Sequence, residues 1–244
     1  RIGRPFAHIG RGLTAVGAMF CNFSALARLP VVDATAISFV SPLFTVAMSA
    51  LILKERVRVY RWSAVIVGFS GVLVMLAPHL DVGGASATEA GMIGAMLGLA
   101  GAVFAAGSTV QTRALTASET TSSIVLYFSL ICALAGLATW PLGWVSPDWP
   151  ELAALIVIGI CGGLAHILLT ESYRLAPASL VAPFDYTSML WALVLGYLVF
   201  GEVPDILVFV GAGIIAGAGL FVIWRERQLG LQRARAAEGP PTGT

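Results

Sequence analysis

The sequence has little charge: Asp, Glu, Lys and Arg make up 11% of its 244 residues, whereas hydrophobic residues make up 58%. A soluble domain carries about 25% charged residues. The deficit excludes an ordinary soluble domain and indicates a chain that crosses a membrane several times. The net charge is +1, and no basic patch with interleaved aromatics occurs, so no nucleic-acid partner is expected.

Cysteine is scarce and the common catalytic motifs are missing. Cys21, Cys132 and Cys161 lie inside apolar runs, which argues against a disulfide framework or a metal site. There is no G-x-x-x-x-G-K loop, no His-Glu-x-x-His and no nucleophile with a base, so neither an enzyme nor a cofactor is expected. No signal-peptide pattern is present. The chain begins with Arg, and we expect the natural protein to have further residues before it.

Long apolar runs divide the chain into predicted membrane spans. The run 33–53 has 21 residues. As a helix it would be about 31 Å long, close to the ~30 Å hydrocarbon core of a bilayer. The predicted fold class is an all-α polytopic membrane protein with eight transmembrane helices, at 12–27, 33–53, 62–78, 90–112, 121–142, 152–173, 178–200 and 206–224.

The placement of positive charge supports this division. Thirteen of the 14 Lys and Arg residues fall in alternate links, and Arg28 alone falls in the others. By the positive-inside rule the links rich in Lys and Arg are cytoplasmic. They include the polar segment 1–11 and the tail 225–244, which is expected to be disordered. The C-terminus is therefore predicted to be cytoplasmic.

Two segments share one order of features: an Arg-Leu link, a span interrupted by proline, a glutamate at its end and a further span. These features are Arg28, Pro42 and Glu55 in one segment and Arg174, Pro183 and Glu202 in the other. Residues 1–78 are thus predicted to be three spans of a first copy without its first two, and 90–224 a complete five-span copy. Five is odd, so the copies have opposite orientations, as is typical of alternating-access transporters.

Several motifs occur in one order along the chain: Leu29-Pro30, the stretch 33–39, Ser41-Pro42, Leu53–Arg56, Arg61-Trp62, Gly68 with Gly71, 173–177 and Gly201-Glu202. Through these motifs, the chain from Arg11 to about Arg227 resembles the EamA type of the drug/metabolite transporter superfamily. The resemblance implies ten spans in two inverted five-span copies. It also implies secondary transport of an amino acid-like, drug-like or S-adenosylmethionine-like metabolite across the inner membrane. The resemblance leaves open whether a proton is the coupling ion and whether the protein assembles as a homodimer.

One span carries a stripe of small polar residues and proline, spaced by three and four: Thr35, Ser38, Pro42, Thr45 and Ser49. Such residues share a helix face. They predict a cavity wall, in which Pro42 leaves the carbonyl of Ser38 free for a substrate. The alternative is close helix packing, which small hydroxyl residues permit.

A second candidate position is Asp185, about 10 Å into its span at ~1.5 Å per residue. An ionisable group at depth normally faces a cavity or a partner, so Asp185 predicts a substrate or proton site. The alternative is a carboxylate paired with Arg174 or Arg113. Its neighbour Tyr186 is included in the site, and Trp191 is placed there as a stacking surface, with apolar packing as the alternative.

His166 and Asn22 complete the predicted cavity lining. His166 is either a proton relay or a neutral histidine bonded to a neighbouring helix, and Asn22 is either a cavity donor or a helix–helix bond. Glu171 is expected to pair with Arg174. Small-residue ridges predict close helix packing at Gly91, Gly94, Gly98 and Gly101, and also at Gly159, Gly163, Gly213 and Gly217.

The sequence features bear on three classes of function. The inverted repeat, interrupted spans and sparse buried polar groups favour a secondary transporter for a small molecule. The sequence lacks the catalytic motifs that an intramembrane enzyme would need. A structural subunit of a membrane complex is the alternative, and it predicts indifference to changes at Asp185, His166 and Ser38.

Overall fold

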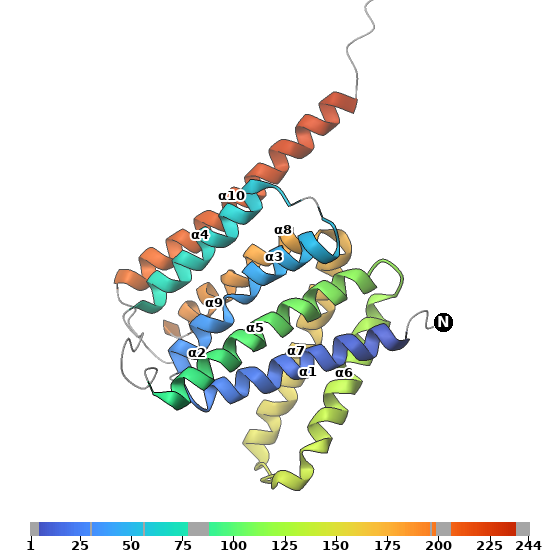
Figure 1. The fold of residues 1–244 in the computed structure, drawn as a ribbon, viewed down its shortest axis with the longest axis vertical. Coiled ribbons are helices and arrows are strands. Elements are labelled where there is room, and N and C mark those ends of the chain that lie inside the picture. Colours follow the sequence, from blue (N-terminus) through green and yellow to red (C-terminus); the bar gives the residue numbers. More distant parts are fainter. Residues whose placement is uncertain are drawn as a thin grey trace, which may run out of the picture. The chain divides into compact units, whose positions relative to one another are not determined.

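In the computed structural model the described residues are 5–29, 31–55, 57–77, 88–195, 197–198 and 206–237. Regular structure within these ranges is helical (Figure 1). The helices form two compact units, unit 1 from residues 1–56 and 80–182, and unit 2 from residues 57–79 and 183–244. The predictions made for Arg1, Arg4, Arg56, the loop 78–87 and the link 201–205 lie outside the described residues.

Unit 1 is built on α1 (Pro5–Leu26) and α5 (Glu89–Leu115), which lie side by side (Figure 1). Glycines on α5 allow this approach. A Cβ on Gly101 would lie 2.5 Å from the Asn22 Oδ1, and one on Gly94 would lie 2.9 Å from the Leu29 side chain. The packing predicted for the α5 ridge is confirmed. The prediction of close packing is wrong for the later glycine pairs, Gly159 with Gly163 and Gly213 with Gly217. At these four positions an added Cβ meets no described atom within 4 Å.

Proline interrupts the next membrane segment, as predicted. The chain forms α2 (Val31–Ser38) and then α3 (Ser41–Ile52), with Pro42 in the first turn of α3. Proline has no N–H, so the Ser38 carbonyl loses its usual partner four residues on. α3 packs against α5 and against the short helix α8 (Ala178–Val181).

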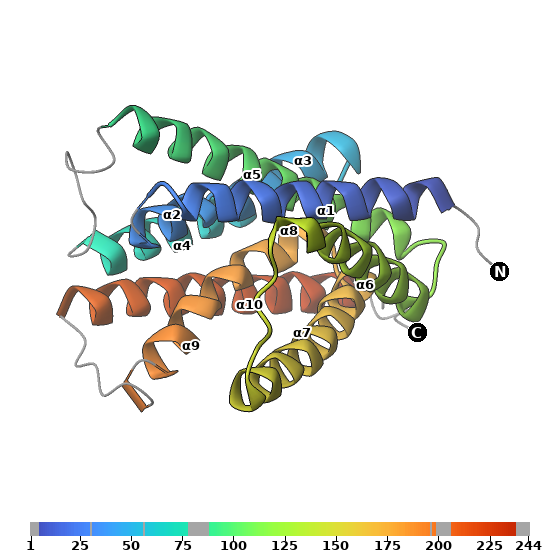
Figure 2. The same ribbon diagram turned by 90° about the horizontal axis from the view of Figure 1, so that it is seen from below.

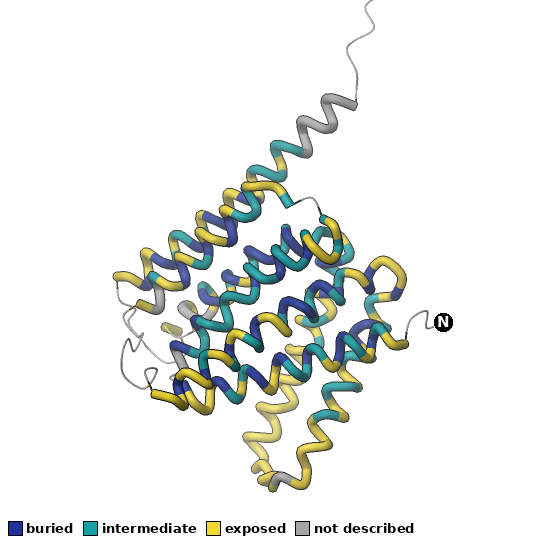
Figure 3. The backbone as a smooth tube through the Cα atoms, in the orientation of Figure 1, coloured by how far each residue is buried: buried dark blue, intermediate teal, exposed yellow. Residues whose placement is uncertain are grey.

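A helical hairpin completes unit 1. It consists of α6 (Thr121–Ala138), the short turn η3 (Trp140–Leu142) and α7 (Trp149–Leu175), and Figure 2 shows its two long helices side by side. A capping box between Asp148 and Glu151 begins α7, with both bonds at 3.0 Å. Away from α1 and α5 the hairpin is exposed almost all round (Figure 3). Its surface there is mostly apolar, as expected of helices in contact with lipid.

Unit 2 contains α4 (Val59–Leu76), α9 (Thr187–Leu195) and α10 (Ile206–Ala237), preceded by the turn η4 (Ala182–Tyr186) that begins at the unit boundary. α4 and α10 pack along one another through Gly71, where an added Cβ would lie 3.0 Å from the Gly211 carbonyl. The Tyr186 ring fits onto Gly68, where an added Cβ would lie 2.5 Å from its Cδ2.

Five segments of the described chain are long and apolar enough to cross a membrane: Asp33–Ile52, Glu89–Leu115, Thr121–Ala138, Trp149–Leu175 and Ile206–Leu229. Together with the all-helical architecture they support a polytopic membrane protein. α4 is a shorter apolar helix over Val59–Val74.

Two boundary predictions are wrong. The sequence predicts a polar link over residues 1–11, yet α1 begins at Pro5, so Arg11 lies inside a helix and is buried. Proline fits the start of a helix because the first N–H groups have no intrahelical partner. The sequence predicts a disordered tail from residue 225, yet α10 continues to Ala237. Its Arg, Glu and Gln residues are good helix formers, and no proline follows before Pro240.

Candidate functional site

Buried polar side chains gather at one end of unit 1, where the first turns of α1 meet the end of α5, the start of α6 and the second half of α7. Their centre is Arg11, 2% exposed. Its Nε donates to Thr112 Oγ1 at 2.6 Å and its Nη1 to the Ile124 carbonyl at 3.0 Å. The guanidinium also lies over the Phe128 ring, 4.5 Å from its centroid. These contacts join three helices through one side chain.

The fourth contact of Arg11 determines the protonation state of His166. Arg11 Nη2 lies 2.8 Å from His166 Nε2. Because a guanidinium only donates hydrogen bonds, Nε2 accepts and carries no proton. His166, whose ring also stacks on Phe128 with centroids 4.1 Å apart, is therefore a neutral histidine bonded to a neighbouring helix. Of the two roles predicted for His166, the geometry favours this one over a proton relay.

A second histidine, His8, lies one turn before Arg11 and is buried. Its Nε2 is 4.0 Å from Glu119 Oε2, and the two side chains are 1% and 3% exposed. Its ring lies against Tyr127, with centroids 4.8 Å apart. Neither ring nitrogen has a hydrogen-bond partner among the described residues. We define the Arg11 cluster as His8, Arg11, Thr112, Glu119, Tyr127, Phe128 and His166.

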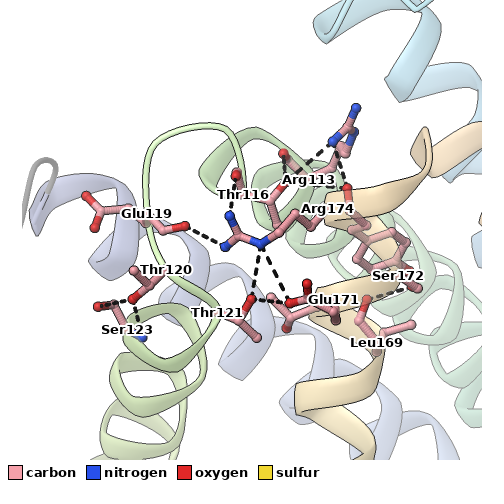
Figure 4. Close-up of polar contacts among 12 residues, drawn as sticks. Arg113, Thr116, Glu119, Thr120, Thr121, Ser123, Leu169, Glu171, Ser172 and Arg174 are labelled. Atoms are coloured by element: carbon pink, nitrogen blue, oxygen red, sulfur yellow. Dashed lines mark hydrogen bonds and ion pairs between the residues drawn. The ribbon is translucent and has the colours of Figure 1, made fainter.

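Arg174 joins this region to the end of α7 (Figure 4). Its guanidinium donates to the carbonyls of Thr116 at 3.2 Å and Glu119 at 2.7 Å. Its predicted pairing with Glu171 is confirmed, with Nε 3.6 Å from Oε2. The same carboxylate accepts a bond from Thr121 at 2.6 Å. One arginine thus holds the α5–α6 link to the last turn of α7.

A third group of contacts lies where α7 turns into α8. Lys54 adopts the left-handed φ of 53°, and the following Glu55 N–H donates to the Ser49 carbonyl at 3.2 Å, which ends α3. The Glu55 carboxylate then accepts from Ala178 N at 3.3 Å, and from Ser179 N and Oγ at 3.3 and 3.0 Å.

Arg113 lies at the same place. Its Nε is 3.6 Å from the Glu55 carboxylate, and its Nη1 donates to the Tyr173 carbonyl at 2.7 Å. We define the junction cluster as Glu55, Arg113, Tyr173, Ala178 and Ser179. It connects the chain after the first interrupted span to the start of the second.

Unit 2 has its own polar contact. Glu226 on α10 accepts bonds from Tyr60 and from Arg61 on α4, with Arg61 Nη2 at 2.8 Å. The contact joins the first turn of α4 to the C-terminal half of α10, and the two helices pack along their length.

The predicted site residues of unit 1 lie on different elements. Asn22 fits against Gly101 on α5, as expected of a helix–helix contact. Thr35 and Ser38 are half-buried on α2, where the Ser38 hydroxyl donates to the Thr35 carbonyl at 2.8 Å, and Pro42 is buried on α3. The structure joins His166 to Arg11 and not to these residues.

In unit 2, Asp185 is exposed, Tyr186 is fully buried and Trp191 is 68% exposed. The partners proposed for Asp185 are engaged elsewhere, because Arg113 contacts Glu55 and Arg174 contacts Glu171. In the described part of the chain, no group of three or more His, Cys, Asp or Glu side chains could hold a metal ion.

Sequence reasoning missed four functional candidates. They are His8, Arg11, Glu119, and Glu55 in its role as a hydrogen-bond acceptor for the start of α8. Pro5 was the available signal for the first two. Placed at the start of a helix, it would have put His8 and Arg11 one and two turns inside.

Comparison with known proteins gives one family. The profile of the EamA-like transporter family matches residues 3–77 and 92–224. The S-adenosylmethionine uptake transporter of Rickettsia prowazekii is 30% identical over 228 residues, which are 93% of this chain and 75% of the relative. The pseudopaline exporter CntI of Pseudomonas aeruginosa is 33% identical over 213 residues, 85% of this chain and 71% of the relative.

A riboflavin transporter of Rhizobium johnstonii is 30% identical over 224 residues, which cover 91% of this chain and 71% of the relative. Among solved structures, one crystal structure superposes with a TM-score of 0.78 at 22% identity, covering 90% of this chain and 78% of the other. The structural match concerns the fold alone.

Proposed function

The chain belongs to the EamA-like transporter family, and we propose on that premise that it carries a small metabolite by alternating access. The relatives named above are transporters, so the protein is an integral membrane transporter of small molecules and not an enzyme. Their names include uptake and export. For the substrate we propose a metabolite of the amino acid-like, drug-like or S-adenosylmethionine-like kind.

The architecture that we propose has eight spans in this chain, as part of ten in two inverted five-span copies. The family profile matches in two segments, which supports a division into residues 1–78 and 90–224. Each copy then contains one interrupted span, α2–α3 around Pro42 and α8–η4–α9 around Pro183. Interrupted helices free backbone groups at mid-membrane, where transporters bind substrate.

The observation that carries the mechanism is the junction cluster. Glu55 follows the interrupted span of the first copy, and Ser179 begins that of the second. Three hydrogen bonds to one carboxylate therefore hold the two copies together at this end. A hydrogen bond to a charged group contributes about 1.5–3 kcal/mol. A contact of this strength is firm enough to close one side and weak enough for substrate binding to open it.

For the cavity we propose Thr35, Ser38 and the broken backbone at Pro42 from the first copy, with Asp185, Tyr186 and Trp191 from the second. Asn22 and His166 stay in this proposed lining, although their contacts with Gly101 and Arg11 favour supporting roles. We further propose an inner-membrane location with a cytoplasmic C-terminus, a proton as coupling ion and a homodimer as the assembly.

A cross-link at the junction tests the mechanism. In the full-length protein with its cysteines replaced, Glu55→Cys and Ser179→Cys would be joined by a disulfide, and uptake of labelled S-adenosylmethionine and riboflavin into proteoliposomes would be measured. Alternating access predicts that oxidation stops uptake and reduction restores it. Each single cysteine, oxidised alone, is the matched control. Unchanged uptake after complete cross-linking would refute opening at this junction.

A further inference from the structure

In unit 2, α4 and α10 lie side by side (Figure 1), and a groove of about 320 Å³ opens along one side of the pair. That volume is at the lower end of the ~300–1,000 Å³ of small-molecule sites. The groove is suited to an apolar ligand. Apart from Ser63, the described residues that line it are apolar, and they include Ala64 and Val67 on α4 and Gly217, Ala218 and Phe221 on α10.

Small residues leave the space for this groove. The two helices are in close contact at Gly71, where an added Cβ would lie 3.0 Å from the Gly211 carbonyl. At Gly217, by contrast, an added Cβ would meet no described atom within 4 Å. On the two walls Val67 and Phe221 are 44% and 41% exposed. The groove is therefore open from outside the helix pair.

An arginine lies at the polar end of the groove. Arg225 follows Phe221 by four residues, so the two side chains share a face of α10. Between them in sequence, Trp224 is 53% exposed, and its ring centroid is 6.1 Å from that of Phe221. Tryptophan is enriched at the membrane–water interface. Arg225 is therefore placed at the level of the lipid headgroups, one helical turn from the apolar groove.

Most of the hydrogen-bonding capacity of Arg225 is unused within the described part of the chain. A guanidinium has five N–H donors. Its Nη1 donates to Gln228 Oε1 at 3.2 Å, and no other described residue accepts from it. Glu226, the next residue, binds Tyr60 and Arg61 on α4. The half-buried Arg225 guanidinium can therefore bind an anion at the mouth of the groove.

The chemistry of the two ends favours an anionic phospholipid as the occupant. An acyl chain matches the apolar walls, and a guanidinium binds a phosphate through paired hydrogen bonds. The stretch 225–237 contains four arginines and one glutamate, and a surplus of arginine beside a membrane span attracts anionic lipids. A polar metabolite would instead leave its hydrogen-bonding groups unsatisfied against these walls.

We propose that the groove between α4 and α10 binds one anionic phospholipid, with an acyl chain against Gly217 and Phe221 and the phosphate on Arg225. A lipid held in this way bridges the two helices at the end where Glu226 joins them. The headgroup decides the selectivity. Phosphatidylglycerol has a net negative charge, whereas the choline of phosphatidylcholine places a positive charge beside Arg225. The site does not depend on which metabolite is carried.

Lipid binding tests the site without a transport substrate. Native mass spectrometry of the full-length protein, titrated in detergent with phosphatidylglycerol or phosphatidylcholine, gives the Kd of the first bound lipid. Phosphatidylglycerol should bind more tightly, and Arg225→Gln should weaken its binding about five- to tenfold, because a charged hydrogen bond is lost. Gly217→Leu fills the groove and should weaken the binding of both lipids. Since its side chain enters open space, the melting temperature without lipid should equal that of the parent, which separates loss of the site from loss of the fold.

Arg227→Gln and Gly219→Leu are the matched controls. Each lies two residues from the test position, about 200° round a helix of 3.6 residues per turn, and Gly219 is also an open position. Both variants should keep the Kd of the wild type for phosphatidylglycerol. Equal Kd values for the two lipids in the wild type, or equal losses in Arg225→Gln and Arg227→Gln, would overturn the site. A dimer in the same spectra that Gly217→Leu dissociates, with lipid binding unaffected, would also overturn it, because a second copy would then occupy the groove.

Discussion

Glu55→Gln tests the junction cluster most sharply, because the two side chains have nearly the same shape. The amide keeps one acceptor oxygen, which can still accept from Ala178 N. Its NH₂ group takes the place of Oε2 and cannot accept from Ser179 N, whereas the Ser179 hydroxyl can turn and accept a bond from it. The charge that attracts Arg113, 3.6 Å away, is also lost.

The magnitude follows from these contacts. The bond from Ser179 N to the charged carboxylate is lost, at about 1.5–3 kcal/mol, and the partly exposed ion pair adds at most about 1 kcal/mol. The junction should lose about 2–3 kcal/mol, which shifts an open–closed equilibrium about 30- to 100-fold toward the open state at 1.4 kcal/mol per factor of ten.

The assay is maleimide labelling of Ala178→Cys in the full-length protein without other cysteines. Ala178 is fully buried, so a thiol there reacts only when the junction opens. We expect Glu55→Gln to raise the labelling rate 30- to 100-fold. Glu151→Gln is the control, since Glu151 also bonds a backbone N–H at a helix start but lies on the exposed hairpin. A rate within twofold of the parent would refute the reasoning.

Three further changes should have measurable effects on stability, two on thermal unfolding and one on local hydrogen exchange. Arg11→Lys keeps the charge but cannot make the forked contacts to Thr112, Ile124 and His166, so stability in detergent should fall by about 2–4 kcal/mol; an unchanged melting curve would contradict the cluster. Gly68→Leu places a side chain where the Tyr186 ring lies, so the melting temperature should drop by several degrees, whereas Gly213→Leu, at an open position, should leave it unchanged. Arg174→Gln removes bonds to the α5–α6 link, and faster hydrogen exchange at residues 116–121 is expected; protection equal to wild type would rule out the role given to Arg174.

Helix positions were largely predictable because apolar runs and prolines have direct physical consequences. The run 33–53 with Pro42 inside it predicts two helical pieces, and α2 and α3 have that form. The residues at which helices begin and end were less predictable. Arg11 and the residues after Trp224 are polar, and polarity marks the edge of a bilayer and not the end of a helix. α1 and α10 therefore extend further than the apolar runs.

The polar clusters could not be predicted, because their members are far apart in sequence. Arg11 binds Thr112 and His166, which follow it by 101 and 155 residues. The repeat pairs Glu55 with Glu202, which says nothing of Ser179. Individual buried groups such as His166 were recognisable as unusual. Their partners depend on how α1, α5 and α7 pack, and that is a property of the folded chain.

The central claim, two inverted copies around a transport path, is tested most directly by the sidedness of two equivalent links. Single cysteines at Arg58, after the interrupted span of the first copy, and at Val203, in the corresponding link of the second copy, would be labelled with an impermeant maleimide in intact cells and in inside-out vesicles. Inverted copies predict labelling of Val203→Cys only in cells and of Arg58→Cys only in vesicles. Labelling of both from the same side would contradict the inverted arrangement.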